Sequence, residues 1–146
     1  MQTKTITTIE ELAGITREVL SLCRLHEGAQ VVTLSGDLGA GKTAFVKELA
    51  KQVGIQHEIT SPTFVIMKSY PVTNFPPMTT LTHIDAYRIE SDDEMRVLGF
   101  DALIQTSGTI VCIEWPEKIS GLIPSNAIPV TLALNTDGTR TISYGR

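Results

Sequence analysis

The 146-residue sequence contains few of the residues on which several classes of protein depend. Its two cysteines, Cys23 and Cys112, are too few for a disulfide framework, and we expect both to be buried, reduced thiols. No apolar run approaches the roughly 20 residues of a membrane-spanning helix. Residues 1–5 do not lead into the apolar core of a signal peptide. These absences predict a cytoplasmic protein without a membrane partner.

Basic residues are also scarce. The chain has 12 Lys and Arg against 16 Asp and Glu, a formal net charge of −4. Proteins that grip a nucleic-acid backbone are usually basic, so we expect no DNA binding and only indirect contact with RNA, through a partner. An apolar fraction of 42% with 19% charged residues predicts a single globular domain over residues 1–146.

The strongest motif is a glycine-rich stretch made of Gly36, Asp37, Leu38, Gly39, Ala40, Gly41, Lys42 and Thr43. It fits G-x-x-x-x-G-K-[ST], the phosphate-binding loop of P-loop NTPases. Residues 31–34 before it predict a buried strand, and residues 44–53 after it predict a helix that stops at Gly54. In such a loop the glycines let successive N–H groups face phosphate oxygens. We therefore expect Lys42 to reach the β- and γ-phosphates of a nucleotide and Thr43 to bind Mg²⁺.

The other patterns predict an α/β protein, P-loop NTPase-like, whose mixed sheet has a parallel core, antiparallel additions and flanking helices. Four further helices are predicted. The first runs from a capping box at Thr8 and Glu11 to about residue 25, and the second begins after a cap at Ser91 or Asp92. Two short ones are predicted at 100–104 and at 116–119. Strands are predicted at 4–7, 64–70, 79–85, 109–113, 130–134 and 140–144. The connection between strands 64–70 and 79–85 is short, and so is the connection between strands 130–134 and 140–144. Each of these two pairs is therefore predicted to form an antiparallel hairpin.

Two acidic residues lie where a P-loop protein needs a carboxylate for Mg²⁺. Glu114 follows an apolar strand, as expected of a Walker B strand, and Asp85 closes another strand. If that strand continues, His83, Asp85 and Tyr87 share one face. Either carboxylate could hold Mg²⁺, directly or through water, or orient the attacking water. The alternatives are an exposed acid for Glu114, a structural histidine for His83 and a core position for Tyr87.

Two further residues are candidates for the site. Thr63 lies downstream of the P-loop helix, where other P-loop NTPases carry a threonine that senses the γ-phosphate. Trp115 is the only tryptophan and directly follows Glu114, so it is either a core anchor or a residue that stacks on a ligand or partner. An acidic run at 90–94 indicates a solvated face or a docking patch.

Together these motifs resemble the TsaE (YjeE) family, the small bacterial ATPases of tRNA threonylcarbamoyladenosine biosynthesis. The resemblance covers roughly residues 5–135. The motifs that carry it are residues 36–43, Ser61-Pro62-Thr63-Phe64, the His-x-Asp-x-Tyr-Arg stretch at 83–88, Glu94 with Leu98-Gly99, and Ile113-Glu114-Trp115-Pro116-Glu117. The stretch at 83–88 and the Glu114-Trp115-Pro116 element are far more specific than the loop alone.

The resemblance implies a protein that binds ATP with Mg²⁺, hydrolyses it slowly alone and docks on an assembly of TsaD and TsaB. That assembly transfers a threonylcarbamoyl group to the adenosine next to the anticodon, so contact with tRNA would be indirect. The implied roles are phosphate and metal binding by Lys42 and Thr43, a switch-like segment at Thr63, and Mg²⁺ binding and hydrolysis by Asp85 and Glu114. Trp115 would be a functional aromatic residue beside them. Glu11 would contact the nucleotide, since the N-terminal segment helps cover the base in this family.

Two other functions fit a P-loop. A small-metabolite kinase would close an arginine-bearing lid over the phosphates, but no arginine-rich stretch is present and only Arg88 could act in this way alone. A non-hydrolytic, nucleotide-gated binding module would use ATP only to order a docking surface. A GTPase is disfavoured because the chain lacks an Asn-Lys-x-Asp element to read guanine.

Overall fold

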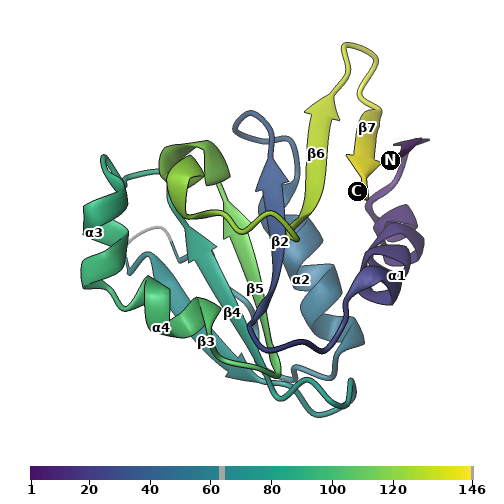
Figure 1. Cartoon of the computed structure of the whole chain (residues 1–146). Helices are drawn as coiled ribbons and strands as arrows, with labels where there is room; N and C mark the ends of the chain where they lie inside the picture. Colours follow the sequence, from purple (N-terminus) through teal and green to yellow (C-terminus); the bar gives the residue numbers. More distant parts are fainter. Residues whose placement is uncertain (63–64, 146) are drawn as a thin grey trace.

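A mixed sheet of seven strands runs through the protein in a computed structural model that describes residues 1–62 and 65–145 (Figure 1). The strands are β1 (Gln2–Ile6), β2 (Gln30–Ser35), β3 (Met67–Pro71), β4 (Thr80–Asp85), β5 (Thr109–Glu114), β6 (Ile128–Leu134) and β7 (Arg140–Tyr144). Their order across the sheet is β1-β7-β6-β2-β5-β4-β3. The strands β6, β2, β5 and β4 are mutually parallel, whereas β1 and β7, β7 and β6, and β4 and β3 pair antiparallel. The predicted α/β fold, with its parallel core and antiparallel hairpins, is confirmed.

Helices cover both faces of this sheet (Figure 1). One face carries the 3-10 turn η1 (Ile9–Glu11) and the helices α1 (Leu12–Leu22) and α2 (Lys42–Gln52). The other face carries the helices α3 (Asp92–Val97) and α4 (Phe100–Ile104) and the 3-10 segment η2 (Pro116–Leu122). Because successive strand residues point to opposite faces, Val32 packs with α1 and α2, and Val31 packs with the second group.

The inner strand β5, between β2 and β4, is buried along its whole length. A parallel strand covered on both faces needs apolar residues at nearly every position, which explains its uninterrupted run of Thr, Ile, Val and Cys before Glu114. Burial raises the pKa of the Cys112 thiol, so this cysteine is an unreactive part of the core. Cys23, which the sequence predicts to be buried, is only partly buried, and its Sγ donates to the Val19 carbonyl oxygen at 3.8 Å.

Three local predictions are wrong, two at the end of an element and one at a helix cap. The first helix ends at Leu22 and not near residue 25, because Cys23 is extended, with ψ at 138°. The hairpin strand begins at Met67, since Ile66 before it has a left-handed φ of +67°, and the predicted start at Phe64 lies outside the described residues. Thr8 makes no side-chain capping bond to the backbone; instead its hydroxyl donates to Glu11.

Other local predictions are confirmed. The Glu11 carboxylate does reach back, and it accepts hydrogen bonds from the Thr7 N–H at 3.4 Å and the Thr7 hydroxyl at 2.8 Å. The Ser91 hydroxyl caps α3 by accepting from the Glu94 N–H at 3.4 Å. Among the described helices none has the length and apolar content needed to cross a membrane.

Because α2 is packed against the sheet, we expect substitution of a valine in it to lower stability more than substitution of an exposed valine. Val46 in α2 is fully buried, whereas Val97 at the end of α3 is 86% exposed. Val46→Ala should lower the free energy of unfolding by about 2–3 kcal/mol, because it removes buried methyl groups and leaves a cavity. Val97→Ala should change it by less than about 0.5 kcal/mol. Urea denaturation of both variants checks this, and equal effects would contradict the described packing.

Candidate functional site

Residues 36–41 connect the end of β2 to the start of α2 as a tightly curled loop. Gly39 and Gly41 have left-handed φ angles of +81° and +109°, which residues with side chains rarely adopt. A Cβ atom at Gly36 would lie only 2.4 Å from the Leu132 carbonyl oxygen of β6. The motif therefore has glycine where the backbone turns and where it passes close to the neighbouring strand.

Lys42 holds its ammonium group inside this curl. Its Nζ donates hydrogen bonds to the carbonyl oxygens of Gly36, at 2.5 Å, and Asp37, at 2.9 Å. The same atom lies 4.2 Å from the centre of the Trp115 ring, a cation–π distance. The residue is only 5% exposed. A largely desolvated positive charge is thus placed beside the backbone N–H groups that begin α2, where an anion would be stabilised.

Glu114 lies next to Thr43 although the two are far apart in the sequence. The Thr43 hydroxyl donates toward both carboxylate oxygens, at 3.1 Å to Oε1 and 3.0 Å to Oε2. Strand pairing explains the contact: β5 runs parallel to β2 with Glu114 opposite Leu34, so β5 ends beside the loop. His83 Nε2 lies 2.6 Å from Glu114 Oε2. Glu114 is 3% exposed, so it is not the exposed strand-end acid of the alternative interpretation.

Asp85 is the cross-strand neighbour of Glu114 in the β4–β5 ladder. One of its oxygens accepts a hydrogen bond from the Tyr87 N–H at 3.0 Å. The strand ends at Asp85, so Tyr87 does not continue the face that carries His83 and Asp85. Tyr87 is also not a core residue, since 44% of its surface is exposed. Its ring contacts that of Trp115, with a centroid distance of 5.0 Å.

Trp115 forms one wall of the site. Its φ of +60° and ψ of 52° are left-handed, which is uncommon for a bulky residue and strained. The Trp115 N–H donates to the Leu34 carbonyl at 3.3 Å, which fixes the turn that follows β5. The ring therefore lies over Lys42 and beside Tyr87, and Trp115 is a partly buried wall residue, not a fully buried core anchor.

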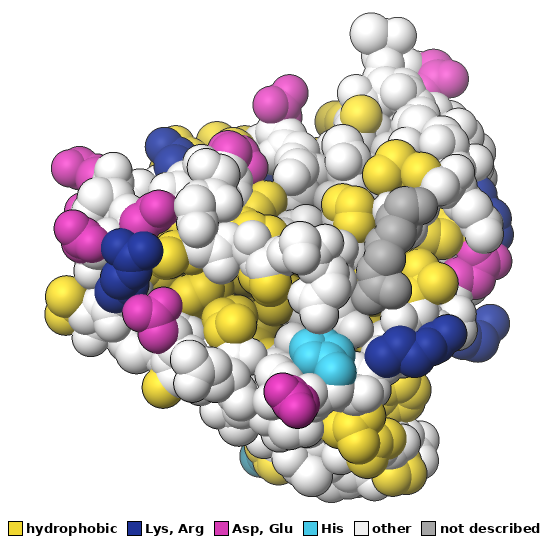
Figure 2. All heavy atoms as spheres, viewed as in Figure 1, with side chains coloured by type: hydrophobic (Ala, Val, Ile, Leu, Met, Phe, Trp, Pro, Cys, Tyr) yellow, Lys and Arg dark blue, Asp and Glu magenta, His cyan; other side chains and the backbone are white. Residues whose placement is uncertain are grey.

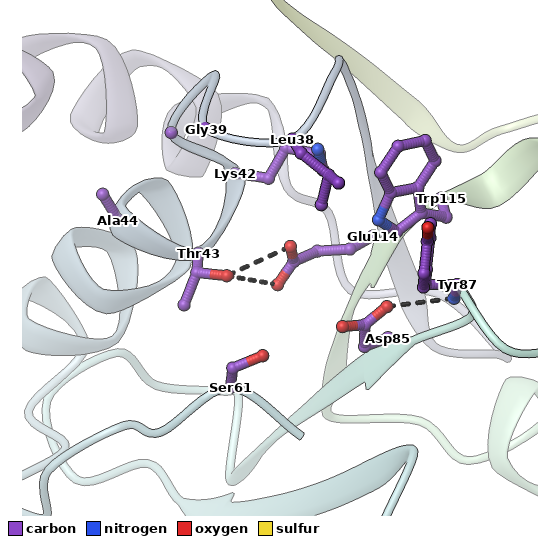
Figure 3. A pocket seen from close by; sticks show the side chains of 11 residues that line it. Leu38, Gly39, Lys42, Thr43, Ala44, Ser61, Asp85, Tyr87, Glu114 and Trp115 are labelled. Carbon is purple, nitrogen blue, oxygen red and sulfur yellow. Dashed lines mark hydrogen bonds between the residues drawn. The ribbon is translucent and has the colours of Figure 1, made fainter. Parts of the chain in front are cut away.

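These groups surround a cavity of about 340 Å³. Figure 3 shows the Thr43 hydroxyl, the carboxylates of Asp85 and Glu114 and the Ser61 hydroxyl around a common space. The lining residues are Leu38, Gly39, Gly41, Lys42, Thr43, Ala44, Ser61, Asp85, Tyr87, Glu114 and Trp115. The predicted candidate Thr63 lies outside the described residues.

The donor set suits a phosphate chain with a bound Mg²⁺. Among the described residues there is no group of three His, Cys, Asp or Glu side chains that could hold a metal by itself. A P-loop magnesium site needs none, because phosphate oxygens and water supply most ligands beside one hydroxyl and one carboxylate. The Thr43 hydroxyl and the Glu114 carboxylate, in contact at 3.0 Å, fit this need.

Glu11 does not line the cavity. The hydrogen bond from the Thr7 hydroxyl lowers the pKa of its carboxyl group, which is held at the start of η1. Its neighbours Ile9 and Glu10 line a second cavity of about 380 Å³ together with Ala44 and Lys47, just beyond the loop. The N-terminal segment thus lies near the start of α2, and the nucleotide contact of Glu11 stays a prediction.

Arg140 makes a contact with the loop that no motif indicated. Its Nε donates to the Ala40 carbonyl of the loop at 3.1 Å, from the start of β7. The hairpin that carries Arg140 was predictable, but its place beside the loop follows from the pairing of β6 with β2, which leaves no local signal in the sequence. The contact of His83 with Glu114 was missed for the same reason.

A strand, a G-x-x-x-x-G-K-T loop and a helix, beside a parallel strand that ends in an acidic residue, define a protein of the P-loop NTPase-like α/β class. Within this class, the model of the family "Threonylcarbamoyl adenosine biosynthesis protein TsaE" matches residues 6–142, and the chain belongs to that family. The resemblance read from the motifs is confirmed.

Individual relatives agree with this membership. The TsaE protein of Treponema pallidum is 40% identical over 120 residues, which cover 82% of this chain and 84% of the relative. That of Bacillus subtilis is 38% identical over 114 residues, covering 78% and 68%. The crystal structure of Bacillus subtilis YdiB superposes with a TM-score of 0.75 at 27% identity and covers 98% of this chain and 83% of YdiB.

Because the loop passes close to β6, we expect alanine substitutions at Gly36 and at Gly14 to change the stability of the protein in opposite directions. Gly36→Ala should destabilise the protein by about 1–3 kcal/mol, because its Cβ would meet a backbone oxygen that cannot move independently. Gly14→Ala, in α1, adds a Cβ that meets nothing within 4 Å, and should stabilise by about 0.5–1 kcal/mol. Thermal or urea unfolding measures both, and a neutral Gly36→Ala would contradict the described packing of the loop.

Proposed function

We propose that this protein is a Mg²⁺-dependent ATP-binding protein and ATPase that supports threonylcarbamoyladenosine modification of tRNA. The proposal rests on the family membership and on one contact, the hydrogen bond between the Thr43 hydroxyl and Glu114. That contact joins the residue that follows the P-loop lysine to the acid of a neighbouring parallel strand, which is the arrangement needed to bind Mg²⁺ beside a triphosphate.

The loop and α2 would bind the phosphates. The curled backbone presents its N–H groups, the start of α2 adds the positive end of the helix dipole, and Lys42 adds a full charge. Lys42 reaches the inner surface of the curl, where its two carbonyl contacts would be replaced by phosphate oxygens. The cavity beside the loop has room for a phosphate chain and a cation.

The two carboxylates would have different roles. Both oxygens of Glu114 face the Thr43 hydroxyl and one also contacts His83, which suits a ligand of Mg²⁺, direct or through water. Asp85 faces the cavity from the next strand, which suits a group that orients the attacking water and accepts its proton (Figure 3). Bound Mg²⁺ would neutralise charge that develops on the β- and γ-phosphates.

Docking on TsaB and TsaD, in the cytoplasm, is part of the proposal. Leu38, at the tip of the loop, is 73% exposed and Tyr87 is 44% exposed, so the rim of the cavity carries apolar surface that a partner would cover. The net charge of −4 supports contact with tRNA through these partners.

Figure 2 shows acidic side chains around α3 and α4. There Arg96 pairs with Asp93 at 2.9 Å in an exposed position, as expected of a solvated face.

The kinase alternative has less support. Arg88 is exposed, and Arg140, the arginine that contacts the loop, lies on a strand and bonds a backbone carbonyl. Neither position resembles a closing lid. The nucleotide-gated module keeps the same binding residues and differs only in the fate of the γ-phosphate, so only a hydrolysis measurement separates it from the ATPase.

The first test is release of free phosphate from MgATP, with the protein alone and with purified TsaB and TsaD. We expect slow release alone and clear stimulation by the partners. Lys42→Ala should lower nucleotide affinity about 10-fold or more, since hydrogen bonds from a charged group contribute about 1.5–3 kcal/mol, and should abolish the stimulated rate. Phosphate on an added metabolite would instead support the kinase, and ATP-dependent docking without release would support the binding module.

A second test separates hydrolysis from binding. Asp85→Asn keeps the size of the side chain but removes the proton acceptor, and should lower turnover by about 10²- to 10⁴-fold, the usual contribution of general-base catalysis. Glu114→Gln should mainly weaken the response to Mg²⁺. Affinity for nucleotide in EDTA should change little in either variant. Unchanged turnover in both variants, measured with the partners present, would contradict the assignment of the two carboxylates.

A further inference from the structure

We infer that His83 is a positioning residue: it holds the Glu114 carboxylate in the orientation that binds Mg²⁺. This inference rests on the proposed function, because Glu114 acts on Mg²⁺ only there. No motif assigned a role to this histidine beyond its membership of the stretch at 83–88, and a structural role was the alternative.

The contact is set by the sheet. His83 in β4 lies opposite Cys112 in β5, and Glu114 is two residues further along β5 on the same face. The imidazole therefore reaches Glu114 along the diagonal of the ladder, with 2.6 Å between Nε2 and Oε2. His83 is fully buried, and Glu114 is 3% exposed. Water cannot easily replace a donor at this position.

The surroundings of the two ring nitrogens of His83 determine which of them carries the proton. Nδ1 of His83 is buried and has no hydrogen-bond partner among the described residues. A carboxylate oxygen only accepts, so the proton of a neutral imidazole belongs on Nε2, where it points to Glu114. Oε2 then accepts from His83 on one side and from Thr43, at 3.0 Å, on the other. Two donors from different elements, β4 and α2, fix the plane of one carboxylate.

Packing alone does not favour histidine at this position. A leucine or methionine could fill the buried volume without an unsatisfied nitrogen, whereas the imidazole leaves Nδ1 without a partner. The property that histidine adds is the Nε2–H donor toward Glu114. Outer hydrogen bonds of this kind orient carboxylate ligands of metals, and their loss typically lowers metal affinity by about 10- to 100-fold.

The experiment compares His83→Gln with His83→Asn. The glutamine amide nitrogen can reach close to the position of Nε2, whereas the shorter asparagine cannot. Titration calorimetry gives the affinity for ADP and for a non-hydrolysable ATP analogue, in EDTA and in Mg²⁺. We expect His83→Asn to reduce the enhancement of affinity by Mg²⁺ about 10- to 100-fold, with affinity in EDTA within about 3-fold of the wild type. His83→Gln should keep most of the enhancement.

Each result has a defined meaning. Equal enhancement by Mg²⁺ in the wild type, His83→Asn and the apolar variant His83→Leu would overturn this inference alone. Equal loss in His83→Gln and His83→Asn, in proportion to a fall in melting temperature, would also overturn it in favour of a structural role. A wild type whose nucleotide affinity does not respond to Mg²⁺ would overturn the proposed metal site, and this inference with it.

Discussion

The register of β5 between its two parallel neighbours determines where the polar groups of the site lie. Glu114 stands opposite Leu34 of β2 on one side and Asp85 of β4 on the other. A slip of one residue would turn Glu114 to the face covered by α3 and η2, away from Thr43. The buried, apolar β5 prevents this slip, because its two faces pack against different helices. The same burial that stabilises the fold therefore fixes the position of the carboxylate.

This arrangement places several polar groups where water has little access. Lys42, His83, Asp85 and Glu114 are each less than 10% exposed. A buried donor or acceptor without a partner costs about 1–3 kcal/mol, and neighbours satisfy the polar atoms of these side chains that face the cavity, whereas the Nδ1 of His83 has no partner among the described residues. Lys42 bonds two loop carbonyls and contacts Trp115, and Glu114 accepts from two side chains. The mutual contacts keep the charges in place beside the cavity, where they are weakly screened and act strongly on a bound anion or cation.

Much of this could be predicted from the sequence wherever a local pattern specifies the structure. The loop, the strand before it, the helix after it and the acid at the end of β5 follow from the motif and from short apolar runs, and the hairpins follow from their turn residues. Contacts between residues far apart in the sequence left no such local pattern. The diagonal from His83 to Glu114 and the contact of Arg140 with Ala40 depend on which strands are neighbours. The end of β4 at Asp85 agrees with the predicted range of 79–85, so the condition under which Tyr87 would share a face with His83 and Asp85 is not met.

The topology of the sheet supports the location of the site independently of the motif. The strand β2 pairs parallel with β5, and the chain leaves these two adjacent strands toward opposite faces of the sheet, through α2 after β2 and through η2 after β5. At such a point the loops that leave adjacent strands diverge and open a crevice at their carboxyl ends, which is where ligands bind in open α/β sheets. The cavity lined by Lys42, Thr43 and Glu114 lies there. Its walls come from the loop after β2 and the ends of β4 and β5, so the position of the crevice follows from strand order, and the P-loop residues determine what it binds.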